Sequence, residues 1–299
     1  MKILLTGTTG YVGSQLLPVL IAAGHDVQGL ARNPAKVVSA DAPILKGDVL
    51  SGEGLDEALA GVDVAYYLIH SMVGGGDFAA RDRQAARNFA AAAKRQGVRR
   101  IVYLGGLGDG DDSAHLNSRH ETAELLADGA PEFVHARAAV VVGSGSASFV
   151  MLQDLVKRLP AMVCPRWIDV RTQPIATADV VGALLRCGER EGLSGEVQLG
   201  GADVVTYREM ILSLADALDR RHPLIVRVPV LTPRLSSYWV GLVTGVDGGI
   251  ARPLIHGLKT ETLVTTPPPA GINDNPLGIA AAMQAALSNP ITDPSLTGS

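Results

Sequence analysis

Short apolar runs and amphipathic stretches alternate along the first half of the chain. The first apolar run predicts a strand over residues 2–6, and the amphipathic stretch behind it predicts a helix over 11–23 that ends at Gly24. Further strands are predicted at 26–31, 42–46, 62–68, 100–104 and 133–142, and further helices at 55–60, 78–96 and 114–128. This alternation predicts an α/β fold, a doubly wound parallel sheet with helices on both faces.

The pattern changes after about residue 143. Helices, a strand and an apolar segment at helical spacing are predicted at 146–159, 177–190, 206–221, 224–228 and 229–263. Thr177 is the expected N-cap of its helix, and Thr206 and Glu209 have the spacing of a capping box. The simplest interpretation of the apolar segment around Trp239 is the core of a smaller C-terminal α/β lobe.

The turn after the first strand carries the most specific motif. It reads TGTTGYVG over residues 6–13, a GxxGxxG pattern between a strand and a helix. Gly7 permits the tight turn, Gly10 lets the backbone approach a pyrophosphate, and Gly13 lets the helix pack closely on the strand. The expected cofactor contacts in this motif are Gly7, Thr8, Thr9, Gly10, Tyr11, Val12 and Gly13. The alternative is a strand–helix turn that needs glycines for packing alone.

The motif predicts a NAD(P)-binding Rossmann domain over residues 1–143. Residues 144–290 are expected to contribute late sheet strands and a small lobe on the substrate side, and residues 291–299 a flexible tail. Ligands of such sheets bind at the carboxyl ends of the strands. The other expected cofactor contacts are therefore Arg32, Asp48, Val49, Leu68, Ile69, His70, Gly105 and Gly106.

The end of the second strand bears on the choice of cofactor. NAD-specific sites of this kind usually place Asp or Glu there, to accept a hydrogen bond from the ribose 2′-hydroxyl. This strand instead runs into Arg32, and residues 29–36 contain no acid. A guanidinium can bind a 2′-phosphate through two hydrogen bonds, so NADPH/NADP is favoured over NAD. The alternative is that Arg32 is a solvated loop residue.

The composition argues against several other classes of function. A net charge of −4 gives no basic footprint for nucleic acid, and 4% aromatic residues provide no base-stacking platform. Cys164 and Cys187 stand far apart, which suits a reducing cytoplasm and argues against a disulfide framework or a metal site. No apolar run reaches the roughly 18–20 residues of a transmembrane segment. A small-molecule substrate is the expected partner, and a homodimer is left open.

With TGTTGYVG, AYYLIHSM (65–72) and YLGGLG (103–108), the chain resembles the atypical or extended short-chain dehydrogenases/reductases. It most resembles the NmrA-like NAD(P)H-binding bacterial proteins, often labelled nucleoside-diphosphate-sugar epimerase-like. The likeness extends over about residues 1–290 and includes QPIATADV (173–180) and TYREM (206–210). The resemblance implies that Asp48 and Val49 contact the adenine ring; the alternative for Asp48 is a role in the turn after Gly47.

The chain departs from the standard family pattern at the catalytic positions. Standard members use Ser, Tyr and Lys, but the fifth strand here ends in Gly105-Gly106, and His115 and Arg119 stand where Tyr and Lys are expected. Arginine is a poor proton relay, whereas histidine can act as a general acid near neutral pH. The catalytic candidates are therefore His115, His70 and Arg119, with a buried structural role as the alternative for His70 and a polar surface role for His115.

Three functions compete. The first is an NADPH-dependent reductase that transfers hydride to a small hydrophobic carbonyl, enone or quinone-like substrate. The second is a non-catalytic NADP(H)-binding redox sensor of the NmrA type, favoured by the missing Ser and Tyr. The third is a sugar-nucleotide epimerase or dehydratase, which ranks lowest because it needs the absent Tyr and Lys.

Overall fold

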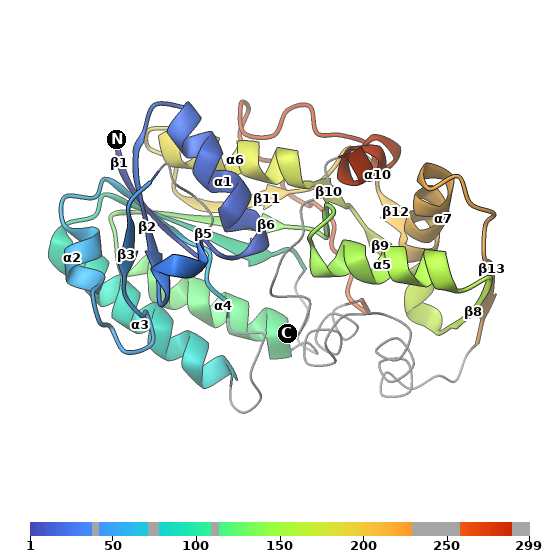
Figure 1. Ribbon diagram of the computed structural model, residues 1–299, viewed down its shortest axis with the longest axis horizontal. Coiled ribbons are helices and arrows are strands. Elements are labelled where there is room, and N and C mark those ends of the chain that lie inside the picture. The colour runs from blue at the N-terminus through green and yellow to red at the C-terminus, as the bar shows by residue number, and fades with distance from the viewer. Residues whose placement is uncertain (38–41, 71–77, 109–113, 229–257, 289–299) are drawn as a thin grey trace.

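The computed structural model describes residues 1–37, 42–70, 78–108, 114–228 and 258–288 (Figure 1). Its central sheet has seven strands in the order β11-β6-β5-β4-β1-β2-β3, and every neighbouring pair is parallel. The strands are β1 (Lys2–Thr6), β2 (Asp26–Ala31), β3 (Ile44–Lys46), β4 (Val64–Tyr67), β5 (Arg100–Gly106), β6 (Glu132–Ala138) and β11 (Gly195–Leu199). The predicted fold class, a doubly wound parallel sheet, is confirmed.

Helices cover both faces of this sheet (Figure 1). On one face lie α1 (Tyr11–Ala22) and α6 (Thr177–Glu189), and on the other α2 (Leu55–Leu59), α3 (Phe78–Gln96) and α4 (Ala114–Ala127). Two buried clusters result, one on each side of the sheet. In the second, the rings of Tyr67 and Phe89 meet edge to face with centroids 5.0 Å apart. The sheet is therefore apolar on both faces, as parallel sheets require.

The C-terminal part adds a smaller α/β region beside the sheet (Figure 1). It holds helices α5 (Ala147–Arg158), α7 (Tyr207–Ala217) and α10 (Ile279–Ser288) and the 3₁₀ turn η2 (Arg166–Asp169). Its strand pairs are β7 (Val141–Val142) with β10 (Ile175–Ala176), β9 (Arg171–Thr172) with β12 (Val205–Thr206), and β8 (Ala161–Cys164) with β13 (Leu224–Arg227). Phe149, Trp167 and Met210 belong to its separate core. Another 3₁₀ turn, η1 (Pro34–Lys36), follows β2.

The described helices include none with the length and apolar character needed to cross a bilayer. The predicted apolar segment around Trp239 and the predicted tail at 291–299 lie outside the described residues. The capping box of Thr206 and Glu209 is confirmed at the start of α7.

Two local predictions are wrong. The strand expected over 133–142 divides into β6 and β7, which join different sheets. The N-cap of α6 is Ala176 rather than Thr177. The Thr177 hydroxyl instead donates to the Val142 carbonyl at 3.1 Å and lies 2.9 Å from the Tyr11 hydroxyl. Tertiary hydrogen bonds to β7 and α1 therefore take the place of the local cap.

Candidate functional site

The glycine motif forms a compact loop between β1 and α1. Gly7 has φ of +71°, which favours glycine, and a Cβ there would lie 2.7 Å from the Leu68 carbonyl oxygen. A Cβ on Gly13 would lie 2.1 Å from the Gly7 carbonyl oxygen, so only glycine lets α1 pack this closely on the loop. A Cβ on Gly10 would meet nothing closer than the Gly7 oxygen at 3.3 Å. The loop is therefore packed tightly at Gly7 and Gly13 and less tightly at Gly10.

The N-terminus of α1 is built to receive an anion. Gly10 is its N-cap, no side chain caps it, and its first turn carries no acid. The N–H groups of the first turn therefore lack helical acceptors and form the positive end of the helix dipole. The hydroxyl oxygen of Thr8 is buried and has no partner among the described residues. The free N–H groups at this uncapped N-terminus fit a dinucleotide diphosphate.

The adenosine end of the predicted site lies beyond β2 and β3. Arg32 directly follows β2 and is exposed. Asp48 lies in a turn, where its carboxylate accepts from the Leu50 N–H at 2.8 Å and its N–H donates to the Glu53 carbonyl. Val49 is buried against the helices of that face. The turn role of Asp48 is thus visible, and its contact with adenine remains a prediction.

The end of β4 lies against the glycine loop. The buried Thr6 hydroxyl donates to the Tyr66 carbonyl at 2.9 Å and accepts from the Leu68 N–H at 3.2 Å. Thr6 therefore ties β1 to the segment that holds Leu68 and Ile69, the two predicted cofactor contacts at the end of this strand. Thr9, another predicted contact, is an exposed residue at the tip of the glycine turn.

His70 follows this segment and is held by an acid. Its Nδ1 lies 3.3 Å from Oδ2 of Asp82 on α3, and the two side chains are 14% and 6% exposed. Ser118 of α4 donates to the same carboxylate oxygen at 3.3 Å. Asp82 thus fixes the orientation of the imidazole and favours the tautomer with its proton on Nδ1.

Three neighbours set the pKa of His70. Burial lowers it below its usual range, the positive charge of Arg119 lowers it further, and Asp82 opposes both effects. The imidazole is therefore neutral at pH 7, with Nε2 as a hydrogen-bond acceptor. In this state His70 accepts a proton, and it can donate one only after it has been protonated.

The ends of β5 and α4 bring Gly105, Gly106 and Arg119 together. A Cβ on Gly105 would lie 2.3 Å from Nε2 of His135, and one on Gly106 would contact Leu116 and Arg119. Arg119 donates from Nη1 to the Leu104 carbonyl at 3.3 Å, while its buried Nε has no acceptor among the described residues. The helical position of His115 is described, but its side chain lies outside the described residues.

A cavity of about 270 Å³ opens where the sheet meets the C-terminal region. Its wall includes Val12 of α1, Gly105 and Gly106 of β5, and Arg119 of α4. The opposite wall comes from the C-terminal region and is mainly apolar, with Met151, Leu152, Leu155, Trp167, Tyr207 and Leu258 among its residues. The cavity therefore borders both the glycine motif and the predicted catalytic position Arg119.

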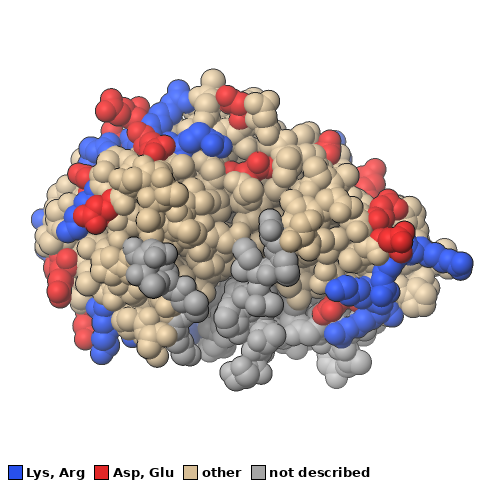
Figure 2. Space-filling model, turned by 45° about the horizontal axis from the view of Figure 1, so that its top comes forward, with Lys and Arg blue, Asp and Glu red and all other residues tan. Residues whose placement is uncertain are grey.

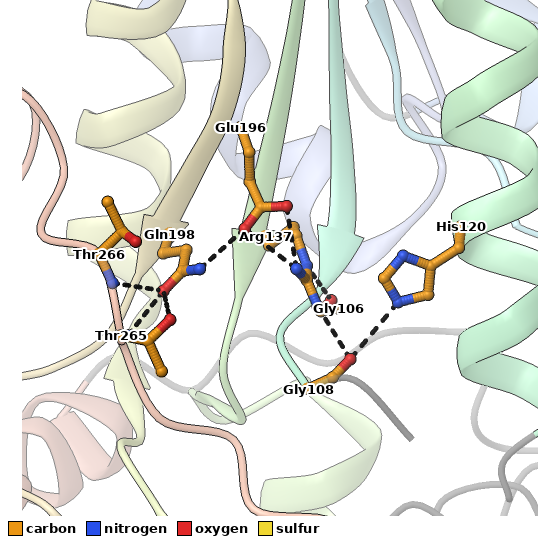
Figure 3. Close-up of polar contacts among 8 residues, drawn as sticks. All are labelled: Gly106, Gly108, His120, Arg137, Glu196, Gln198, Thr265 and Thr266. Atoms are coloured by element: carbon orange, nitrogen blue, oxygen red, sulfur yellow. Dashed lines mark hydrogen bonds and ion pairs between the residues drawn. The ribbon is translucent and has the colours of Figure 1, made fainter. Parts of the chain in front are cut away.

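A buried arginine fixes the loop on the edge of this cavity (Figure 3). Arg137 of β6 donates from Nε to the Gly106 carbonyl at 3.2 Å and from Nη2 to the Gly108 carbonyl at 2.9 Å. Its Nη1 forms hydrogen bonds of 3.0 and 2.9 Å with Glu196 of β11. Figure 3 shows the network continuing through Gln198, whose Nε2 donates to Glu196 at 2.8 Å and whose Oε1 accepts from Thr265 and Thr266.

Sequence reasoning missed Asp82 and Arg137. Asp82 looks like one more charge on an Ala- and Arg-rich helix, and only the packing of α3 against α4 shows that it is 4% exposed. Arg137 lies in a strand sequence, FVHARA, without a known motif. A charge within an otherwise apolar strand was the available signal, because buried arginines need partners.

Comparison with known proteins agrees with this geometry. Residues 7–152 match a family described as NAD(P)H-binding. An uncharacterized protein of Mycobacterium tuberculosis is 28% identical over 239 residues, which cover 80% of this chain and 25% of that protein. A 3-beta-hydroxysteroid dehydrogenase of Mycolicibacterium neoaurum is 29% identical over 113 residues, 34% of this chain and 31% of that protein. Two mycobacterial relatives match over 80% of this chain. The match covers only about a quarter of the length of those relatives.

Solved structures share the fold. An NADPH-dependent quinone oxidoreductase of Escherichia coli, complexed with NADPH, superposes with a TM-score of 0.77 at 20% identity, covering 97% of this chain and 100% of that chain. A nucleoside-diphosphate-sugar epimerase of Staphylococcus aureus superposes with a TM-score of 0.74 at 20% identity, covering 95% of this chain and 100% of that one.

Proposed function

We propose that the chain is an NADPH-dependent reductase of small apolar carbonyl, enone or quinone-like compounds, of the atypical short-chain dehydrogenase/reductase type. The match of residues 7–152 to a family described as NAD(P)H-binding supports this proposal. The observation that carries this proposal is the mainly apolar cavity of about 270 Å³ between Val12 of α1 and the C-terminal region. A cavity with apolar walls and few polar groups binds an apolar ligand and orients it through those groups. The similar quinone oxidoreductase, whose structure contains NADPH, supports this choice.

The cofactor would be held by the residues described above. The glycine loop and the uncapped N-terminus of α1 would bind the diphosphate. Arg32 would bind the 2′-phosphate, since residues 29–36 contain no acid at the end of β2. When bound, NADPH supplies the hydride that reduces the acceptor.

The residues of the chain would then stabilise the negative charge that forms on the substrate and supply the proton that neutralises it. Hydride addition to a carbonyl places negative charge on its oxygen. Arg119, which borders the cavity, would donate a hydrogen bond to that oxygen. His70, oriented by Asp82, would exchange the proton with solvent, since its neutral form must first take up a proton. The role of His115 as a further proton donor remains a prediction.

Oxidation of NADPH by the purified protein tests the proposal. The substrates are quinones, enones, aldehydes and ketones that span a range of apolar size, with cofactor binding titrated on the same sample. We expect oxidation that depends on one of these substrate classes. Tight NADPH binding without oxidation across the panel would instead support the sensor, the alternative favoured by the missing Ser and Tyr.

A further inference from the structure

The end of the molecule formed by β8 and β13 carries an exposed apolar face. The two strands run parallel, with Leu224 opposite Ala161 and Val226 opposite Val163. Leu224 is 65% exposed, Val163 49% and Val226 45%. The alternate residues of β8 point inward and are buried. Of the six large apolar side chains that are exposed in the described part of the chain, three lie on this small sheet.

Basic side chains surround this face. Residues 157–168 and 220–228 contain six Lys or Arg and one His but no Asp or Glu, although the whole chain has a net charge of −4. The six are Lys157, Arg158, Arg166, Arg220, Arg221 and Arg227. Figure 2 shows Lys and Arg side chains at the end of the molecule where Figure 1 places β8 and β13, with Asp and Glu side chains close beside them.

Part of this charge lines a surface hollow. The hollow has a volume of about 370 Å³, and five of its eight lining residues are basic: Lys157, Arg158, Arg220, Arg221 and His222. Asp154 lies 3.5 Å from Arg158, Asp169 lies 3.2 Å from Arg227, and Asp216 lies 2.6 Å from His222. Lys157 and Arg221 have no ion-pair partner among the described residues, so this end keeps uncompensated positive charge.

We propose that this end, which we call the β8–β13 pole (residues 157–168 and 220–228), docks on the surface of an anionic phospholipid bilayer. The exposed apolar side chains would enter the headgroup region, and the cations would pair with lipid phosphates, as amphipathic surface elements do. A free phosphate or a nucleic acid would use the cations but gain nothing from Leu224. A second copy of the chain would bring like charges together. The proposal does not depend on the proposed reductase activity.

Co-sedimentation with vesicles tests this docking. The full chain is mixed with vesicles of phosphatidylcholine alone or with added phosphatidylglycerol, over a range of sodium chloride concentrations. We expect binding only to the anionic vesicles and weakening with salt, since each Lys or Arg near such a surface contributes about fivefold in partition coefficient. The double charge reversal Lys157→Glu/Arg221→Glu should reduce partitioning by about 25-fold or more.

The apolar face has its own variants. Leu224→Ser/Val226→Ser should reduce partitioning by roughly tenfold at unchanged charge. Two control variants change exposed residues away from this pole. They are Lys94→Glu on α3 and Val204→Ser, at a side chain that is 50% exposed, and both should bind like the wild type. All of these side chains are exposed, so the fold should tolerate each change.

Three results would overturn the proposal. The first is equal binding to neutral and anionic vesicles, or to neither. The second is an unchanged partition coefficient in Leu224→Ser/Val226→Ser. This result would mean that the basic side chains adsorb to the vesicles by charge alone and that the apolar face plays no part. The third is loss of vesicle binding in inorganic phosphate at an ionic strength where sodium chloride has no effect, which would identify the hollow as a site for free phosphate.

Discussion

At the scale of single residues, the proposed function depends on three side chains, those of Arg32, Arg119 and His70. Arg32 follows β2 in a stretch, residues 29–36, that contains no acid, and Arg119 borders the cavity. His70 is neutral because burial and Arg119 outweigh Asp82. Each of these groups can be changed without removing a large apolar side chain from the core.

Arg32 is predicted to set the preference for NADPH. Arg32→Glu replaces a cation by an acid that repels the 2′-phosphate and accepts from a 2′-hydroxyl. Its dissociation constant for NADPH should rise by about tenfold to a hundredfold, with a much smaller change for NADH, in a fluorescence titration. Lys94→Glu makes the same change of charge on α3 and should leave both constants unchanged. An unaltered preference in Arg32→Glu would show that Arg32 is only a solvated loop residue.

Asp82 is predicted to shape the pH dependence of reduction through His70. The pKa of His70 is lowered below its usual range, so its proton-donating form is populated only at acidic pH, and kcat should rise as the pH falls through that lowered pKa. Asp82 raises this pKa, so Asp82→Asn should move the rise in kcat to still lower pH. The measurement is kcat against pH for both proteins.

Two controls separate this role from structural damage. His70→Gln should remove the rise in kcat, and thermal unfolding of each variant would reveal any general loss of stability. A kcat profile of the same shape in the wild type, Asp82→Asn and His70→Gln would exclude His70 as the proton carrier.

At the scale of elements, the strongest predictions came from strands and helices with clear hydrophobic periods. The bounds of β1, β2 and α3 agree with the sequence prediction, because their apolar positions define them. Gly97 directly follows the end of α3, and Gly24 lies shortly before the start of β2. β8, β9, β10 and β12 were not predicted. They are two to four residues long and are defined by pairing with distant segments, which a local pattern does not contain.

The candidate site divides in the same way. The glycine loop could be predicted because its motif is local and each glycine has a steric reason, as Gly7 and Gly13 show. The partners of His70 and of the Gly106–Gly108 loop could not be predicted. Asp82 and Arg137 reach them through the packing of α3 and β6, which are 12 and about 30 residues away in sequence.

Gly13 is predicted to be essential for the contact between α1 and the loop. Gly13→Ala places a Cβ 2.1 Å from the Gly7 carbonyl oxygen, so helix or loop must shift at a cost of about 3 kcal/mol or more, with loss of cofactor binding. Gly24→Ala is the control, since a Cβ there meets nothing within 4 Å and only its φ of +82° is unfavourable, at about 1–2 kcal/mol. Chemical denaturation and NADPH titration check both. Equal effects in the two variants would contradict the packing argument.

At the scale of the whole molecule, the cavity lies between the seven-stranded sheet and the C-terminal region. Its inner wall comes from the dinucleotide-binding sheet, and its outer wall from α5, η2 and α7. Hydrogen bonds also connect the parts, from Tyr11 to Thr177 and through the Arg137 network to Thr265 and Thr266 (Figure 3). Under the proposed function, the outer wall sets the shape that an apolar substrate must fill, and the inner wall holds the cofactor.

The proposed reduction of an apolar acceptor in the cavity can be tested in one measurement. It is the rate at which a naphthoquinone or an aromatic enone oxidises protein-bound NADPH. The proteins compared are the wild type, Ser148→Phe, which fills the cavity from α5, and Ala147→Phe, a neighbour that does not line it. We predict saturable oxidation in the wild type and Ala147→Phe, and at least about tenfold weaker kcat/KM in Ser148→Phe with unchanged NADPH affinity. Bound NADPH that no acceptor oxidises, or equal oxidation in all three proteins, would contradict the account.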